Sequence, residues 1–286
     1  MIFFLITFIS VIIFYFINDY IKNFNFLLNY KGQKHQKFSG LKNIPLTGGI
    51  FLTFCSILLI YPDNYLFSLF IFLIFGVGLI SDTNIISSPK LRFTIQSVLI
   101  ILFVFLLDIK INETNFILLD ILLENFYFNF FFPVFCLLIL INGSNFIDGL
   151  NGLLLGYFSL IIFLILYLDL YIYLEIEKVF LINFIIVLIY LFILNINNKL
   201  FMGDSGSYVL GLICGYFLIN INQLNSEISP FFIVLLLWYP CFENLFSILR
   251  KFILKKSPTK ADNNHFHQLV FFYVKKKLRY KKLSPN

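Results

Sequence analysis

The chain has 286 residues, of which 60% are hydrophobic and only 13% are charged, whereas a soluble domain carries about 25% charged residues. This composition excludes a soluble globule, a disordered tail, a disulfide-stabilised miniprotein and a coiled coil. The formal net charge of +6 does not indicate a nucleic-acid partner, because basic residues accumulate on the cytoplasmic side of membrane proteins. We therefore expect an integral membrane protein that binds no nucleic acid.

Nine apolar segments are candidates for crossing the roughly 30 Å hydrocarbon core of a bilayer. They predict helices, in chain order, over 2–17, 44–61, 65–80, 93–107, 126–142, 152–168, 179–194, 207–220 and 229–249. The first has no basic start and no small-residue cleavage site, so we expect a retained span and not a signal peptide. No linker divides the chain. The expected fold is a single all-α domain over 1–286, a polytopic bundle of nine or ten transmembrane helices.

The charged residues between the segments predict the orientation. If the N-terminus lies outside and the spans alternate, every Lys and Arg except Lys110 and Lys178 falls on the cytoplasmic side, while nine of the 15 acids fall outside. This asymmetry predicts an outer N-terminus and a cytoplasmic C-terminus. Residues 250–286 then form a basic cytoplasmic tail that carries a His-x-His motif.

Four polar stretches interrupt the apolar pattern, all on the predicted cytoplasmic side. The first, 142–152, places Asn142, Asn145 and Asp148 at intervals of three, which puts them on roughly one face of a helix. Its glycines let the backbone approach a ligand or a neighbouring helix closely. A capped helix start would need fewer polar groups, so we favour a site for a polar ligand.

Two further stretches carry a carboxylate at the membrane boundary. Asp204 lies between glycines at the start of a span. That setting suits Mg²⁺, which takes one or two carboxylates together with substrate phosphates; the alternative is a simple helix N-cap. Asp82 follows another span and could also cap a helix or bind metal. Lys90 and Arg92 could neutralise phosphate or could reflect only the basic cytoplasmic side.

The fourth stretch is the histidine segment of the tail. His265 and His267 lie one residue apart with Asp262 upstream, a pattern that could bind metal or contact phosphate. A tail of this charge would also adsorb to anionic lipid with no catalytic role. The earlier loop at 34–49 adds His35 and a Pro-x-x-Gly-Gly helix entry.

Together these stretches resemble the polyprenyl-phosphate N-acetylhexosamine-1-phosphate transferases of glycosyltransferase family 4. That superfamily includes the enzymes that initiate enterobacterial common antigen and teichoic acid and the muramoyl-pentapeptide translocase. In the family's order the chain shows Pro-x-x-Gly-Gly from Pro45, Asn-x-x-Asn-x-x-Asp-Gly-x-x-Gly from Asn142, Phe-Met-Gly-Asp-x-Gly-Ser from Phe201, and the His-x-His loop. Pro240 to Glu243 resembles the Pro-x-x-Asp element, with Glu in place of Asp.

The resemblance implies that the chain transfers HexNAc-1-phosphate from UDP-HexNAc to polyprenyl (undecaprenyl) phosphate and releases UMP. Such a reaction initiates a lipid-linked envelope glycan, for example O-antigen. The resemblance also implies a multi-pass enzyme of the bacterial cytoplasmic (inner) membrane that works on its cytoplasmic face. It implies dependence on Mg²⁺, with Mn²⁺ as an alternative, and leaves room for a homodimer.

Residue roles follow from the same resemblance. Asp204 would be the Mg²⁺ ligand on the diphosphate, and Asp82 would bind or deprotonate the lipid phosphate. Asn145 and Asp148 would hold the nucleoside, supported by Asn142. The histidines of the tail, His265 and His267, would contact the sugar-phosphate side.

The chain departs from the family pattern in ways that bear on mechanism. Ser81 stands where the family usually has the first of two adjacent Asp residues, so we expect direct attack by the lipid phosphate and no phospho-aspartyl enzyme. Asn151 stands where translocase-type members have Asp, and His-x-His-Gln replaces three consecutive His. Both differences favour the O-antigen-initiating branch over the peptidoglycan branch.

Two other function classes stay open. The sequence Gly-Asp-Ser-Gly at 203–206 also matches the Gly-x-Ser-Gly motif of rhomboid-type intramembrane proteases, but Ser205 would need a His base, and no His lies inside a predicted span. A transporter is the non-enzymatic alternative. Charges inside the membrane mark transport paths, yet no Lys, Arg or His lies near the centre of a predicted span.

Overall fold

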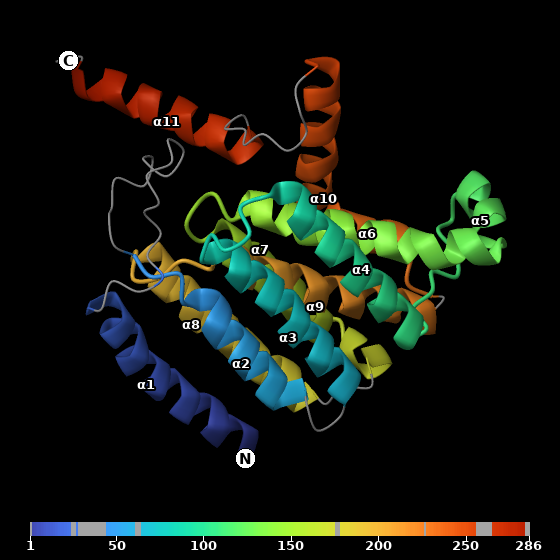
Figure 1. Cartoon of the computed structure of the whole chain (residues 1–286), viewed down its shortest axis with the longest axis horizontal. Coiled ribbons are helices and arrows are strands. Elements are labelled where there is room, and N and C mark those ends of the chain that lie inside the picture. Colours follow the sequence, from blue (N-terminus) through green and yellow to red (C-terminus); the bar gives the residue numbers. More distant parts are fainter. Residues whose placement is uncertain are drawn as a thin grey trace.

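The computed structural model describes residues 2–23, 27, 44–60, 64–174, 178–225, 227–255 and 265–283. These residues form helices and no β-strand (Figure 1). The helices are α1 (Ile2–Asn23), α2 (Gly48–Ile60), α3 (Tyr65–Asp82), α4 (Pro89–Leu106), α5 (Ile117–Leu123), α6 (Phe126–Ile147), α7 (Leu153–Tyr167), the 3-10 helix η2 (Leu170–Leu174), α8 (Lys178–Ile196), α9 (Gly203–Leu224), α10 (Pro230–Ile253) and α11 (Phe266–Leu283).

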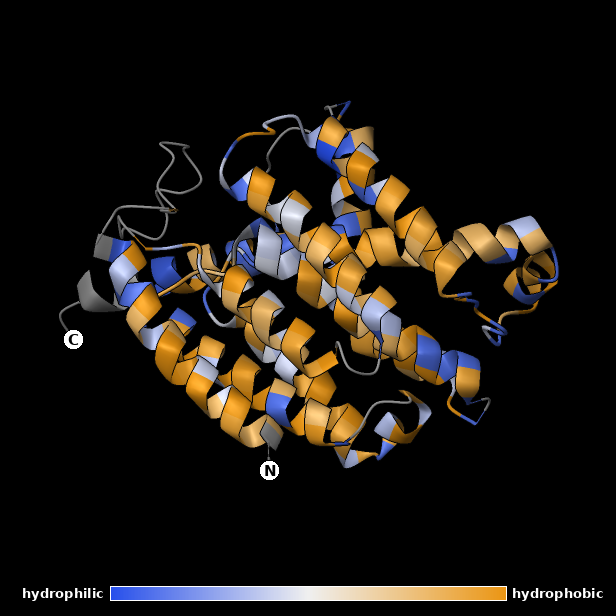
Figure 2. Ribbon diagram, turned by 60° about the horizontal axis from the view of Figure 1, so that its bottom comes forward, coloured by the Kyte–Doolittle hydropathy of each residue, from blue (hydrophilic) through white to orange (hydrophobic). Residues whose placement is uncertain are grey.

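Each of the nine predicted apolar segments contains a helix in the structure, which confirms the all-α polytopic bundle. The second helix is shorter than predicted, because α2 begins at Gly48 and residues 44–47 precede it. Within the described residues, seven helices are long and apolar enough to cross a membrane, and α2 and α7 are shorter apolar helices of 13 and 15 residues. Figure 2 shows apolar residues along most of the length of the bundle helices. The number of spans and their orientation stay predictions.

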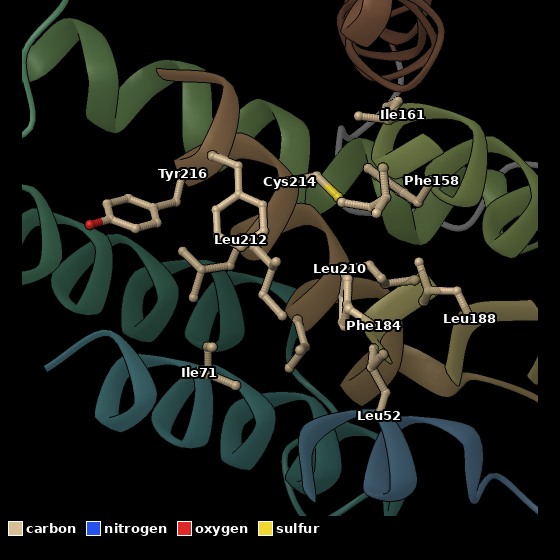
Figure 3. Close-up of a cluster of buried hydrophobic side chains, with 14 of the residues drawn as sticks. Leu52, Ile71, Phe158, Ile161, Phe184, Leu188, Leu210, Leu212, Cys214 and Tyr216 are labelled. Atoms are coloured by element: carbon tan, nitrogen blue, oxygen red, sulfur yellow. The ribbon is translucent and has the colours of Figure 1, made fainter. Parts of the chain in front are cut away.

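Helix α9 forms the centre of the bundle and packs against α2, α3 and α6. Figure 3 shows its Leu210, Leu212 and Cys214 among buried side chains of neighbouring helices. Glycine permits the close approach of α6, because a Cβ at Gly211 would lie 2.9 Å from the Cα of Ile141. Small residues at helix interfaces are the usual means by which membrane helices approach closely. The N-terminus of α9 packs equally closely against α3, because a Cβ at Gly78 would lie 2.3 Å from the Cα of Ser205.

The second half of α10 turns its polar side chains inward and its apolar side chains outward. Its buried residues include Glu243, Asn244, Ser247 and Lys251, whereas Phe242, Leu245, Phe246, Ile248 and Leu249 are exposed. In Figure 1 the C-terminal end of this helix projects beyond the rest of the bundle. Polar side chains of a membrane helix usually face the interior of the bundle and find their partners there.

Helix α11 lies apart from the main bundle in Figure 1. The sequence predicted only a basic tail here and no helix. An exposed apolar run from Leu269 to Val274 precedes the exposed Lys275, Lys276 and Lys277. Adsorption of this basic tail to anionic lipid stays a prediction.

Candidate active site

Four helices converge on the Asp204 carboxylate at the start of α9. Its Oδ1 accepts a hydrogen bond from Asn145 Nδ2 of α6 at 2.6 Å, and its Oδ2 pairs with Arg92 Nη1 of α4 at 2.6 Å. The Ser81 hydroxyl of α3 donates to the same Oδ2 and accepts from Arg92. The side chains of Arg92 and Asp204 are 24% and 26% exposed, so a ligand can reach this group from outside.

Asp82, the last residue of α3, caps α9 from a different helix. Its Oδ1 accepts the backbone N–H of Asp204 at 2.9 Å, and its Oδ2 accepts the backbone N–H and hydroxyl of Ser205 at 3.1 and 2.7 Å. These backbone donors have no partner inside their own helix, and a negative charge at a helix N-terminus is favourable. In this structure Asp82 therefore positions Asp204.

Glycine at position 203 makes this arrangement possible. Gly203 has φ +72°, a left-handed conformation that L side chains rarely adopt, and a Cβ there would lie 2.6 Å from Asp82 Oδ2. Ser205 is fully buried and donates to Asp82. Its hydrogen-bond partner is therefore a carboxylate and not the His base that the serine-protease alternative requires.

The end of α6 brings a third carboxylate to the same place. Asp148 follows α6 and accepts the backbone N–H of Gly203. Burial raises the pKa of Asp148 well above its ordinary value, and the nearby charges of Asp204 and Asp82 raise it further. Asn145 joins the cluster directly, since its Nδ2 also lies 3.2 Å from Ser207 Oγ.

The remaining predicted residues of these stretches lie at the edge of the cluster. Asn142 Nδ2 donates to Gln96 Oε1 of α4 at 3.3 Å and to the Leu138 carbonyl at 2.9 Å. Gln96 is 1% exposed. It was not among the predicted site residues, although an amide inside an apolar helix is a signal that the sequence contains. Lys90 is exposed at the start of α4. Asn151 donates to Asn198 at 2.6 Å, at the end of α8.

The donor set around Asp204 fits a divalent cation bound together with a substrate. In the described part of the chain, no three His, Cys, Asp or Glu side chains group in a way that could hold a metal by themselves. Asp204 accepts from Ser81, Arg92 and Asn145, which uses three of the roughly four lone-pair sites of a carboxylate. One site remains, as expected for Mg²⁺ held by one carboxylate and substrate phosphates.

Two histidines lie over the end of α6 and are held there by α10. Glu243 Oε1 lies 2.9 Å from His265 Nδ1, and the Glu243 carboxylate also accepts the backbone N–H of Phe266 at the start of α11. Tyr239, one turn earlier on α10, places its hydroxyl 3.0 Å from His267 Nδ1. The Glu243 that departs from the family's Asp therefore orients His265. Asp262 and His35 lie outside the described residues.

The histidine segment also contacts the residues that follow Asn145. The ring centroids of His265 and Phe146 are 5.0 Å apart, and a Cβ at Gly149 would lie 2.8 Å from His267 Nε2. Tertiary structure thus connects the histidine segment to the stretch that carries Asp148. Tyr239 was missed in the sequence analysis because it is one of 16 tyrosines and stands in no recognisable motif.

Comparison with known proteins finds relatives of one kind. The chain is 29% identical over 240 residues to the undecaprenyl-phosphate alpha-N-acetylglucosaminyl 1-phosphate transferase of Salmonella typhi, and 28% identical over 240 residues to that of Escherichia coli K12. Each match covers 79% of this chain and 65% of the relative, so the chain spans about two thirds of their length. The protein of the same name from Thermotoga maritima is 32% identical over 71 residues, 25% of this chain and 23% of that one.

The family comparison covers the carboxylate cluster itself. Residues 64–222, more than half of the chain, match the family model of glycosyl transferase family 4. This region contains α3, α4, α6 and the start of α9, the four elements that meet at Asp204. The chain therefore belongs to glycosyl transferase family 4.

Proposed function

We propose that this protein transfers HexNAc-1-phosphate from UDP-HexNAc to polyprenyl phosphate and releases UMP. The observation that carries the proposal is the Asp204 carboxylate, held at the N-terminus of α9 with Arg92 beside it. Guanidinium groups bind phosphate, and the side chain of Arg92 is 24% exposed beside this carboxylate. Phosphoryl transfer depends mostly on positioning and on stabilising phosphate charge, and little covalent chemistry is needed from the protein.

Asp204 is the proposed ligand of Mg²⁺, with Mn²⁺ as the alternative. When bound, the cation would neutralise charge on the diphosphate of the donor. Arg92 supplies a second positive charge at the same oxygen of Asp204, and its guanidinium stays protonated at any physiological pH. Asp82 keeps Asp204 in place through the first donors of α9.

In the proposed reaction an oxygen of the polyprenyl phosphate attacks the phosphorus that bears the sugar. The bond between that phosphorus and the oxygen shared with UMP breaks, and UMP leaves with that oxygen and its negative charge. Ser81 offers no carboxylate, and both oxygens of Asp82 already accept hydrogen bonds from α9. These contacts support direct transfer in a single step over a route through a phospho-aspartyl enzyme.

The donor nucleoside is assigned to the end of α6. Asn145 contacts Asp204 directly, and Asp148 lies close enough for its pKa to respond to the charges of Asp204 and Asp82. A ligand held here would place its diphosphate next to Arg92. Asn142 lies about one helical turn before Asn145 and donates a hydrogen bond to Gln96. His265 of the histidine segment packs against Phe146 at the same end of α6.

The cellular role follows from the same proposal. The names of the relatives support undecaprenyl phosphate as the acceptor and GlcNAc-1-phosphate as the transferred group. The basic residues between the predicted spans support a site on the cytoplasmic face of a bacterial inner membrane. There the enzyme would start a lipid-linked envelope glycan such as O-antigen.

The test is release of UMP by the purified chain in lipid nanodiscs that contain undecaprenyl phosphate, with UDP-GlcNAc and Mg²⁺ added. We expect release that depends on both the lipid phosphate and the cation. Asp204→Asn should lower the rate more than 10-fold, a barrier change above about 1.4 kcal/mol, with expression intact. The matched control is Asp108→Asn, whose side chain is 78% exposed and pairs with Lys110. No UMP from the wild-type chain, as expected of a protease or a transporter, would contradict the proposal.

A further inference from the structure

One side chain of α1 contacts two stretches of chain that lead into helices at the candidate active site. The Thr47 hydroxyl donates to Asn18 Oδ1 at 2.5 Å, and Asn18 Nδ2 donates to the backbone carbonyl of Lys199 at 3.2 Å. Asn18 is 4% exposed and Thr47 is fully buried. The two stretches, residues 45–49 and 199–203, are the entry segments of α2 and α9. Asn18 therefore joins segments that lie far apart in the sequence.

The entry segments also pair with each other through their backbones. Phe201 N donates to the Pro45 carbonyl at 2.9 Å. In the opposite direction, Gly48 N donates to the Phe201 carbonyl at 3.1 Å, and Gly49 N donates to the Met202 carbonyl at 3.2 Å. The first N–H groups of a helix have no partner inside that helix. The entry segment of α9 therefore supplies acceptors for the start of α2.

This pairing fixes the backbone that carries Asp204. The Met202 carbonyl also accepts the N–H of Gly206 at 3.3 Å, in the first turn of α9. The two helix starts are in close contact, because a Cβ at Gly49 would lie 2.4 Å from the Gly206 nitrogen. Gly203, with its left-handed φ of +72°, connects this contact to Asp204. A shift of the entry segments would therefore move the Asp204 carboxylate.

We infer that Asn18 is a positioning residue for the transfer reaction. It holds the entry segments together and so keeps the Asp204 carboxylate where the proposed cation and diphosphate meet. Asn18 acts through Thr47 and the backbone, not on the substrate. The inference rests on the proposed function. A displacement of about 1 Å at a catalytic group, caused by a change far from the chemistry, can lower a rate by about 100-fold.

Helix α1 contains a second contact of the same kind, which provides the control. This helix lies at the edge of the bundle in Figure 1 and packs on α8 and α2. Thr7 is 5% exposed and donates to Asn183 Oδ1 of α8 at 2.8 Å. Eleven residues, about 16 Å of helix, separate Thr7 from Asn18. Loss of either threonine hydroxyl should loosen α1 to a similar extent, but only loss of the Thr47 hydroxyl should affect Asp204.

The experiment compares three variants in nanodiscs. Thr47→Val removes the hydroxyl at similar volume, Thr47→Ser keeps it, and Thr7→Val is the control. The first measurement is kcat for UMP release at saturating substrates and Mg²⁺. The second is the dissociation constant of Mn²⁺ with UDP-GlcNAc present and lipid phosphate absent, read from the electron paramagnetic resonance signal of free Mn²⁺, so that no turnover is needed.

The expected results separate positioning from stability. Thr47→Val should lower kcat by about 10- to 100-fold and weaken Mn²⁺ binding about 10-fold, the low end of the effect of residues that orient metal ligands. Thr47→Ser should retain most of both. Thr7→Val should leave both unchanged, although it should lower Tm as much as Thr47→Val does.

A double variant tests whether Asn18 acts through Thr47. Asn18→Leu removes the acceptor for the Thr47 hydroxyl and the donor to Lys199 together. Adding Thr47→Val to Asn18→Leu removes a hydroxyl that has already lost this partner, so kcat should not fall further. Additive losses in the double variant would overturn the proposed route from Asn18 to Asp204.

The other outcomes are equally decisive. Unchanged kcat and Mn²⁺ affinity in Thr47→Val, or equal losses in Thr7→Val, would make Asn18 only a stabilising contact of α1 and would overturn the inference, with the proposed function intact. If the wild-type chain binds Mn²⁺ but releases no UMP, the proposed function fails, and the Mn²⁺ affinities still decide whether Asn18 positions Asp204. If the wild-type chain neither binds Mn²⁺ nor releases UMP, both claims fail.

Discussion

Replacing Asp82 with alanine removes the carboxylate that receives the first donors of α9. Two backbone N–H groups, those of Asp204 and Ser205, lose acceptors at 2.9 and 3.1 Å, and the Ser205 hydroxyl loses one at 2.7 Å. A buried donor left without a partner costs about 1–3 kcal/mol. The hydroxyl can rotate toward another acceptor, but the two backbone groups cannot. We therefore expect Asp82→Ala to lower the free energy of unfolding by about 2–6 kcal/mol.

Thermal unfolding followed by circular dichroism in nanodiscs measures this loss. For domains of about 150–250 residues, 1 kcal/mol corresponds to about 2–4 °C in Tm, so Asp82→Ala should lower Tm by roughly 10 °C. Asp82→Asn keeps one oxygen acceptor but loses the charge that favours a helix N-terminus, and should lie between the wild type and Asp82→Ala. Asp108→Asn, at an exposed carboxylate, is the matched control and should leave Tm unchanged.

The result that would refute this reasoning is a wild-type Tm for Asp82→Ala together with complete loss of UMP release. In that case Asp82 would act on the substrate directly, for example on the lipid phosphate, and α9 would not need its carboxylate. A lowered Tm with partial activity at low temperature would instead agree with the positioning role that the hydrogen bonds indicate.

Asp148→Ala should weaken UDP-sugar binding, and unchanged nucleotide affinity would contradict its nucleoside role. In a background without native cysteines, Glu113→Cys and Asp262→Cys should be labelled from opposite faces of sealed vesicles; labelling of both from one side would mean a miscounted span. Single-step transfer predicts no exchange of labelled UMP into UDP-sugar in the absence of lipid phosphate, and strong exchange would demonstrate a covalent intermediate. Burial, with the charge of His265, lowers the pKa of His267 from 6.5 to about 4. As the pH falls below 6.5, His267 is therefore protonated in the unfolded chain before it is protonated in the folded one. The stability that neutral His267 provides is complete above pH 6.5 and is lost toward pH 4, so His267→Gln should show a smaller fall in Tm than the wild type over that range.

Most residues of the candidate site were predictable from the sequence, but the contacts that each of them makes were not. The order of polar stretches indicated Asp82, Asn145, Asp148 and Asp204, and the structure brings these four together. From the residues alone Asp82 was a cap or a metal ligand, and the family resemblance gave it the lipid phosphate; Asp204 had the alternative of capping its own helix. The structure shows that Asp82 provides the cap for α9, which frees the Asp204 side chain to face Arg92 and Asn145.

The sequence by itself determined where the apolar helices lie, because a run of apolar residues and the polar residues at its ends are local properties that no distant contact needs to supply. Only the tertiary structure decided which side chains meet. Asp82 and Asp204 are 122 residues apart in the chain, and their contact depends on glycines that let α9 pack closely against its neighbours. The positions of His265 and His267 likewise depend on the packing of α10 against α6, because Glu243 and Tyr239 of α10 hold the two histidines. Contacts of this kind arise from the packing of distant helices, and for that reason periodicity and motif spacing could not predict them.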